Sequence, residues 1–340
     1  MPGPEGSPGP EVKAAFVEVP ASSANLGPGF DALAVALELR LRVTMRWVTT
    51  PSGSGGWPPS LAGLFVTGEG ADEIDRTPAV NRVWQAAMRV FEAAAAPAWA
   101  GRFAVEIEEA NAIPLAAGLG SSAAAAVAGL WGANALVGSP FAYERLLAMA
   151  AAIEGHADNA AAAAVGGFVT CRMGSAGVTA VRVPVPRGEL VAVVAVPPLK
   201  LSTEQARRVL PAEVPLGDAV FNVGGTSLVV AALTTGRFEL LREAMADRLH
   251  QPYRQALVPG LDAVMRAAIE AGAYGASLSG SGPSVLALCR PQQAEAVGDA
   301  MARAFSRYGL NARRFALEPA SEGARLRIRR DSSEGEQGSV

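Results

Sequence analysis

The segment from Pro114 to Ala124 holds the residues of this chain that are best suited to binding an anion. Gly118 and Gly120 permit the positive φ angles and the close ligand approach that a tight phosphate loop needs. Ser121 and Ser122 follow at the expected start of an Ala-rich helix, where either side chain could cap the helix and free amides favour negative charge. No lysine follows the glycines, so this is not a Walker A loop. A capped helix after a glycine turn is the alternative interpretation.

Two further loops of similar composition occur far away in the chain, at 22–31 and 279–284. Each is rich in turn-forming residues and lies at the end of a predicted strand. Any one of the three loops could be a simple turn. Three together indicate loops that converge on one anionic ligand.

Composition excludes several classes of function. The 340 residues are 50% hydrophobic with a net charge of −3, which gives no reason to expect nucleic acid or an anionic membrane as a partner. The longest apolar run, Ala123 to Val137, is too short and too rich in Ala and Gly to span a bilayer. Cys171 and Cys289 lack metal-ligand spacing, so they predict buried free thiols in a reducing compartment. We therefore expect a soluble cytoplasmic protein with a disordered lead, 1–11, that lacks signal-peptide features.

The elements that position the loops are strands and helices mixed without regular alternation, which predicts an α+β fold. Strands are predicted at 13–19, 38–48, 103–108, 168–173, 178–183, 190–196 and 312–317, and a strand interrupted by the loop 279–284 is predicted at 275–288. Helices are predicted at 81–95, over the Ala-rich run 125–131 before a break at 138–140, and at 143–159, 203–210, 218–234, 238–249, 261–271 and 292–308. The pattern changes near 188–200, so we predict domains at 12–190 and 191–320, followed by a polar tail at 321–340.

The segment from Pro114 to Ala124 resembles the phosphate loop of the GHMP kinases, and 280–283 resembles their third motif. Within that family, 20–31 is similar to the first motif of the members that act on L-homoserine. Their substrate segments resemble 154–159, 201–207 and 249–254. The resemblance implies a two-domain fold, with a left-handed βαβ unit in the N-terminal domain and a ferredoxin-like C-terminal domain. It also implies ATP with Mg²⁺, and transfer of the γ-phosphoryl group to the side-chain hydroxyl of L-homoserine on the route to threonine.

The resemblance assigns a set of residues to ATP and its metal. Asn81 would lie near the adenine, although a helix cap after Thr77 and Pro78 is an equal interpretation. The phosphates would contact the loop through Pro114, Gly118, Leu119, Gly120, Ser121 and Ser122, with Ser122 also facing Mg²⁺. Many relatives carry a Mg²⁺-binding Glu where this chain has Ala148, so Glu154 is the nearest substitute. Because Mg²⁺ keeps several waters, loss of one carboxylate need not abolish binding.

A second set would hold the amino-acid substrate. Asn25 and Asp31 would meet its polar head, although both could instead be turn-capping residues. Arg207 and Arg254 would grip its carboxylate, because paired guanidinium groups match a carboxylate in shape and charge. Two such cations would repel each other in the empty site. The resemblance also implies substrate contacts at His156, Asp158, Asn159, Thr203, Gly280 and Ser281.

The expected catalytic residues are Asn159, Ser122 and Asp31. Mevalonate-type members place an Asp, interpreted as the catalytic base, where this chain has Asn159. An amide cannot take a proton, so the mechanism must operate by positioning and charge neutralisation. Functional and purely structural roles stay open for His156 and His250.

Two alternatives remain. One is another small-molecule GHMP kinase, which acts on mevalonate or shikimate. Asn159 and the pair Arg207 and Arg254 argue against mevalonate as the substrate. The other is a catalytically silent member that binds ATP or a metabolite as a regulator, which the intact loop at 114–122 disfavours and Ala148 favours. No nucleic-acid or membrane partner is expected, and a homodimer is left open.

Overall fold

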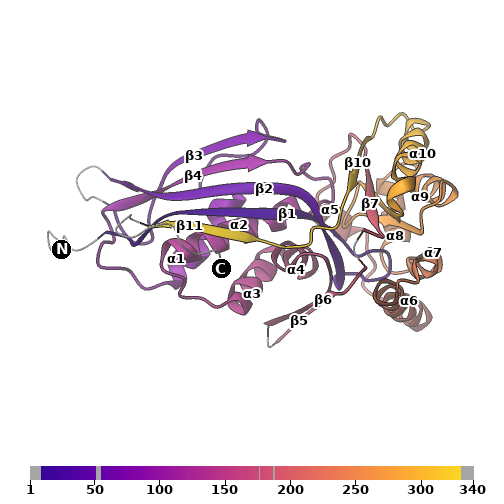
Figure 1. The fold of residues 1–340 in the computed structure, drawn as a ribbon, viewed down its shortest axis with the longest axis horizontal. Helices are drawn as coiled ribbons and strands as arrows, with labels where there is room; N and C mark the ends of the chain where they lie inside the picture. Colours follow the sequence, from indigo (N-terminus) through magenta and orange to yellow (C-terminus); the bar gives the residue numbers. More distant parts are fainter. Residues whose placement is uncertain (1–8, 51–54, 176, 187, 331–340) are drawn as a thin grey trace.

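The computed structural model describes residues 9–50, 55–175, 177–186 and 188–330, so most of the predicted lead and residues 331–340 lie outside it. These residues form two sheets placed side by side along the long axis, each with helices packed against it (Figure 1). Helices and antiparallel strands are mixed, which confirms the predicted α+β fold. Cys171 and Cys289 are buried free thiols, also as predicted.

The first sheet has seven strands within the described residues. They are β1 (Val12–Ala24), β2 (Leu33–Thr49), β3 (Leu61–Gly68), β4 (Phe103–Asn111), β5 (Phe168–Gly174), β6 (Gly177–Val183) and β11 (Arg325–Arg330). The order is β11-β1-β2-β4-β3, with the β5–β6 hairpin attached to β2. Only β3 and β4 pair in parallel, and α1 (Arg82–Ala93) connects them as a βαβ unit. The strand β3 was not predicted.

The helix that follows the phosphate loop is the centre of the first domain. It is α2 (Ser121–Leu136), which lies against β1 and β2 and also contacts α1, α3 (Tyr143–Glu154) and α4 (Asp158–Val165). Contact on several sides explains why α2 is apolar around its circumference. Gly129 allows close packing, because a Cβ there would lie 2.2 Å from the carbonyl oxygen of Val83. The predicted single helix at 143–159 is wrong, since Gly155 ends α3 with a φ of +78°.

The second sheet carries the ferredoxin-like connectivity. Its strands are β7 (Val191–Val196), β8 (Gly275–Leu278), β9 (Val285–Cys289) and β10 (Arg313–Leu317). They pair antiparallel throughout in the order β10-β7-β9-β8, and α9 (Leu261–Glu270) and α10 (Ala294–Ser306) pack on the sheet. This is the order of a split βαβ fold, as the resemblance implied.

Four helices lie in the chain between β7 and α9: α5 (Thr203–Arg208), α6 (Leu216–Thr235), α7 (Leu241–Ala244) and α8 (Gln251–Arg254). Among the described helices, α6 alone has the length and composition of a membrane span, and 22% of that window is buried. Its inner face packs on the protein through Asn222, Val229, Ala232 and Leu233. Its outer face exposes Leu216, Val220 and Val223.

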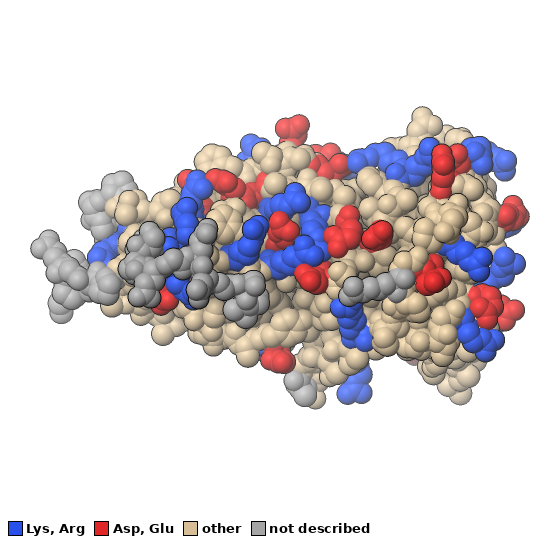
Figure 2. Space-filling model, viewed as in Figure 1, with Lys and Arg blue, Asp and Glu red and all other residues tan. Residues whose placement is uncertain are grey.

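The predicted polar tail is wrong for Arg325–Arg330, because these residues form β11 and pair with β1 (Figure 1, yellow). Leu326 and Ile328 alternate with arginines and pack against the core, which is the pattern of an edge strand. Arginine side chains on the outer edge oppose pairing with another chain. Figure 2 shows basic and acidic side chains interspersed over the face that carries β11.

Candidate active site

The phosphate-type loop ends in a helix start that has free amides. Gly120, with a φ of +68°, is the N-terminal cap of α2, so the expected serine cap is wrong. The first helical hydrogen bond runs from Ala124 N to Gly120 O at 2.9 Å. The amides of Ser121, Ser122 and Ala123 therefore have no acceptor within the helix, and they are available to an anion.

The glycines of this loop are required by what packs against them. A Cβ at Gly118, where φ is +74°, would lie 2.2 Å from the carbonyl oxygen of Ser279. A Cβ at Gly120 would lie 2.1 Å from Ser22 Oγ. Any larger residue would push the loop away from its neighbours, so the two glycines allow both the backbone conformation and the close contact.

The three glycine- and serine-rich loops contact one another. Ser279 Oγ donates to the carbonyl oxygen of Gly118 at 2.7 Å and lies 2.8 Å from Ser23 Oγ. Gly280 N donates to Ala24 O at 3.1 Å. These bonds link the ends of β1, β4 and β8, so the loops form one surface between the two domains.

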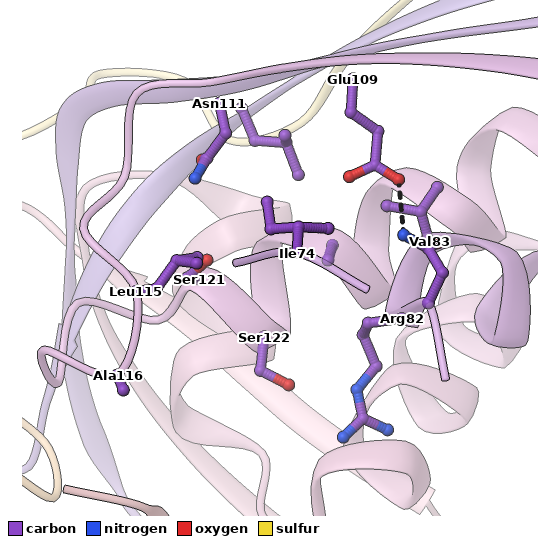
Figure 3. Close-up of a pocket in the computed structure, with 12 residues that line it drawn as sticks. Ile74, Arg82, Val83, Glu109, Asn111, Leu115, Ala116, Ser121 and Ser122 are labelled. Carbon is purple, nitrogen blue, oxygen red and sulfur yellow. Dashed lines mark hydrogen bonds between the residues drawn. The ribbon is translucent and has the colours of Figure 1, made fainter. Parts of the chain in front are cut away.

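One cavity lies between α1, β4 and the start of α2, and has a volume of about 230 Å³. Figure 3 shows Glu109 and Asn111 on one wall, with Ser122 and Arg82 on the opposite side. The remaining lining is mostly apolar: Leu41, Ile74, Val83, Leu115, Ala116 and Ala125, together with Asn81 and Ser121. Of the residues expected at the nucleotide, Asn81, Ser121 and Ser122 line this cavity. Pro114, Gly118, Leu119 and Gly120 do not.

Those four residues shape the loop instead. Leu119 is 1% exposed in the hydrophobic core, and its carbonyl oxygen accepts from Ser22 N at 3.0 Å. Pro114 is also buried. Both side chains anchor the loop, which leaves its backbone to face a ligand.

Asn81 is a helix cap, which confirms one of the two interpretations given from the sequence, and its proximity to adenine stays a prediction. Its Oδ1 caps α1 by accepting from Trp84 N at 2.9 Å, and its Nδ2 donates to Glu109 Oε1 at 3.0 Å across the cavity wall. Burial raises the pKa of the Glu109 carboxyl, and the hydrogen bond from Asn81 opposes that rise. Asn81 is thus a helix cap that also lines the cavity.

The two residues expected at the metal lie together. Ser122, at the start of α2, donates through Oγ to Oε1 of Glu154, at the end of α3, over 2.8 Å. A hydroxyl and a carboxylate oxygen are hard donors, and few protein donors are needed because Mg²⁺ retains water. The donor types of this pair fit Mg²⁺.

All residues expected at the substrate line a second, small cavity of about 20 Å³. They are Asn25, Asp31, His156, Asp158, Asn159, Thr203, Arg207, Arg254, Gly280 and Ser281, joined by Ala24 and Phe30. Asn25 and Asp31 have φ angles of 74° and 56°, a left-handed conformation that polar turn residues tolerate. The structure therefore brings together in one cavity segments from both domains that are distant in sequence.

The arginine pair is partly neutralised by the protein. Arg207 Nη2 donates to Asp31 Oδ1 at 2.6 Å, so the expectation of two unpaired cations in the empty site is wrong for Arg207. Arg254 is 2% exposed and donates to the carbonyl oxygens of Ala206 and Gly280. Burial and the neighbouring Arg207 lower the pKa of Arg254 to about 10. Both guanidinium groups lie over the Phe30 ring, at 5.3 and 5.4 Å.

The two histidines have different partners. His250 Nε2 lies 2.8 Å from the carbonyl oxygen of Gly27 and must donate to it, so Nδ1 accepts from Arg254 at 3.2 Å. Burial lowers the pKa of His250, which keeps this ring neutral and structural. His156 Nδ1 lies 2.6 Å from Asp158 Oδ1. Burial lowers the His156 pKa, but the bond to Asp158 and its charge outweigh burial, and the net shift is upward.

Asn159 is held next to the phosphate loop. Ser22 Oγ donates to Asn159 Oδ1 at 2.9 Å, and Asp158 Oδ1 accepts from Asn159 N at 2.6 Å. The Asn159 amide therefore lies between the loop at Gly120 and the substrate cavity.

Sequence reasoning missed several residues that support the site. The side chain of Asp247 is buried, and its carboxylate accepts from the backbone amides of Leu249, His250 and Gln251, which shapes the segment ending at Arg254. An acid just before a run of turn residues is a capping signal that could have been used. Glu109 had no comparable signal, because its strand contains several glutamates.

The family comparisons agree with this arrangement. The family model described as GHMP kinases N terminal domain matches residues 81–167, and that described as GHMP kinases C terminal matches residues 229–307. The first range contains the phosphate loop, and the second contains Arg254 and the third loop.

Curated relatives and solved structures show which members of the GHMP kinases this chain is similar to. The homoserine kinase of Synechococcus sp. (strain WH7803) is 44% identical over 87% of this chain and 90% of its own length. That of Moorella thermoacetica is 43% identical over 91% of this chain and 98% of its own. The crystal structure of homoserine kinase from Cytophaga hutchinsonii aligns with a TM-score of 0.80 at 30% identity, covering 92% of this chain and 97% of that one. The chain belongs to the GHMP kinase family, and these similarities place it among the homoserine kinases of that family.

Proposed function

We propose that this protein transfers the γ-phosphoryl group of ATP to the side-chain hydroxyl of L-homoserine, giving O-phospho-L-homoserine. The observation that carries the proposal is the substrate cavity, where two arginines and an aspartate face one another beside the phosphate loop. Relatives at 43–44% identity over most of the chain are homoserine kinases.

The chemistry of the cavity matches an amino acid at both charged groups. The carboxylate of homoserine pairs with Arg207 and Arg254, whose planar donors suit it. Its ammonium group pairs with Asp31, and Asn25 donates to Gly280 O and holds the first loop in place. Substrate binding replaces the Asp31–Arg207 ion pair by two pairs with the ligand. The side-chain hydroxyl then extends toward Asn159 and the phosphate loop.

No side chain needs to act as a strong base. Asn159 orients the attacking hydroxyl through its amide, which Ser22 fixes. The free amides at the start of α2 hold the phosphates, and Ser121 and Ser122 add their hydroxyl groups. Phosphoryl transfer depends mainly on such positioning and charge neutralisation, so an Asn in place of an Asp is compatible with turnover.

Ser122 and Glu154 would hold Mg²⁺, which neutralises charge on the transferred phosphoryl group when it is bound. Glu154 can turn from Ser122 toward the ion, because Ser122 is exposed and Glu154, at the end of α3, is only half-buried.

A coupled ATPase assay with a panel of hydroxyl acceptors tests the proposal. ATP consumption must depend on L-homoserine and exceed that with mevalonate or shikimate. Equal ATP consumption with and without homoserine contradicts it, and bound ATP without turnover on any acceptor identifies a silent regulator.

Three further expectations are part of the proposal: a cytoplasmic location, a place on the route to threonine, and a homodimer in preference to a membrane or nucleic-acid partner. The exposed apolar side chains Leu216, Val220 and Val223 on α6 are the surface suited to a second copy. Sedimentation velocity of the wild type and of Val223→Arg measures the assembly, with a monomer expected for the variant only.

A further inference from the structure

We propose that Glu109 reads the nucleotide base: its second carboxylate oxygen accepts a hydrogen bond from the exocyclic amine of a 6-aminopurine. This inference rests on the proposed use of ATP and assigns the specificity for the base to one residue of β4.

Glu109 lies on the buried face of β4. Along β4, the inward-facing side chains are Val105, Ile107, Glu109 and Asn111. Glu109 is 4% exposed, and a buried carboxylate is costly unless its oxygens have partners. A carboxylate at this buried position therefore indicates hydrogen-bond donors for its oxygens.

The hydrogen bonds within the described residues leave one acceptor for the ligand. Glu109 Oε1 accepts from Asn81 Nδ2, and no donor from the described part of the chain bonds to Oε2. Asn111 is already committed, because its Nδ2 donates to the carbonyl oxygens of Glu69 and Ile113 and its Oδ1 accepts from Ile113 N. Figure 3 shows the Glu109 carboxylate pointing into the cavity.

The shape of the cavity sets the orientation of the nucleotide. Ser121 and Ser122, at the anion-binding start of α2, lie across the cavity from Glu109, so phosphates at α2 direct the base toward Glu109 (Figure 3). Apolar side chains such as Ile74 and Val83 line the space between and would grip any purine ring without distinguishing its edge. Burial raises the pKa of the Glu109 carboxyl, and an additional N–H donor would lower it, as the bond from Asn81 does.

The expected preference for ATP over ITP follows from the hydrogen-bond donor at position 6 of the purine. The 6-amino group of adenine donates to Oε2, whereas the 6-oxo group of hypoxanthine places oxygen against oxygen with no proton between them. A buried acceptor without a donor lowers affinity by about 10- to 100-fold. The wild type should therefore bind ATP about 10- to 100-fold more tightly than ITP.

Glu109→Gln should reverse the preference. Asn81 cannot rotate its amide, because Oδ1 caps α1 at Trp84 N, so its Nδ2 still requires an acceptor. In the variant, the oxygen of the new amide then faces Asn81, and the nitrogen of that amide faces the base as a donor. That donor suits a 6-oxopurine, so the ATP-to-ITP affinity ratio should fall by at least about 100-fold.

Isothermal titration of ATP and ITP measures the two affinities directly and needs no turnover, so it separates this inference from the proposed function. The matched control is Glu108→Gln, because Glu108 lies exposed on the other face of β4 and pairs with Arg46; its ratio should equal the wild-type ratio. Equal binding of ATP and ITP by the wild type overturns the inference, and so does an unchanged ratio in folded Glu109→Gln. If that variant does not fold, the wild-type comparison alone decides.

Discussion

The contribution of Arg207 to substrate binding can be estimated from its surroundings. A charge-assisted hydrogen bond to a buried carboxylate contributes about 1.5–3 kcal/mol. The Arg207 side chain is 36% exposed, so solvent screening reduces this to about 1–2 kcal/mol. At about 1.4 kcal/mol per tenfold change, Arg207→Ala should raise the KM for homoserine roughly 5- to 30-fold. The KM for ATP should not change, because Arg207 lines the substrate cavity and not the nucleotide cavity.

Arg207 suits this experiment better than Arg254, because within the described residues its guanidinium group donates to a single side chain, that of Asp31. Loss of that bond should leave the fold intact. Arg207→Lys keeps the charge but loses the planar donor pair, so its KM should lie between those of the wild type and the alanine variant.

The assay is steady-state kinetics with each substrate varied in turn. Arg208→Ala is the control, because Arg208 is 71% exposed on the same helix and pairs with Glu204. If folded Arg207→Ala has a wild-type KM for homoserine, the carboxylate binds elsewhere and the reasoning is refuted. A parallel rise in the KM for ATP would equally show that Arg207 is not a contact of the acceptor.

Four other outcomes are expected. Ser22→Ala should lower kcat with little change in either KM, because the Asn159 amide loses the bond that orients it; a normal kcat would contradict this. Ser122→Ala should lower kcat and raise the Mg²⁺ concentration needed for half-maximal rate. Arg254→Lys should reduce the free energy of unfolding by about 2–4 kcal/mol, measured in urea, because buried carbonyl oxygens lose their donors. Because the folded-state pKa of His156 is raised, its stabilisation is present below its unfolded pKa and lost as pH rises through the folded value. The stability difference between wild type and His156→Gln should therefore be larger at about pH 6 than at about pH 9.

The local sequence was sufficient to predict the phosphate loop. Gly118 and Gly120 are needed because neighbouring backbone and side-chain atoms leave no room for a Cβ, and small residues in a strand–loop–helix pattern predict such a place. The resemblance to a family supplied the residues of the substrate cavity, which span most of the chain and share no local pattern.

Long-range pairs could not be predicted in the same way. The Arg207–Asp31 ion pair joins residues 176 positions apart, and nothing in either segment indicates its partner. The role of Glu109 depends on which face of β4 is inside, and a strand with several glutamates does not show that. The strand β11 was missed because four arginines in six residues outweighed the alternation of Leu326 and Ile328.

The pairing of β11 with β1 has a consequence for synthesis of the protein. The first strand of the chain pairs on one side with residues from the far end of the chain, for example Val17 with Leu326. The edge of β1 therefore remains open on the ribosome until residues 325–330 have been synthesised and have paired with it. An open edge is a template for pairing with other chains, and such distant contacts form slowly. A nascent chain truncated before Arg325 would keep every residue of the nucleotide and substrate cavities. The unpaired edge of β1 would remain exposed in it, so such a chain should aggregate and not fold into a shorter active enzyme.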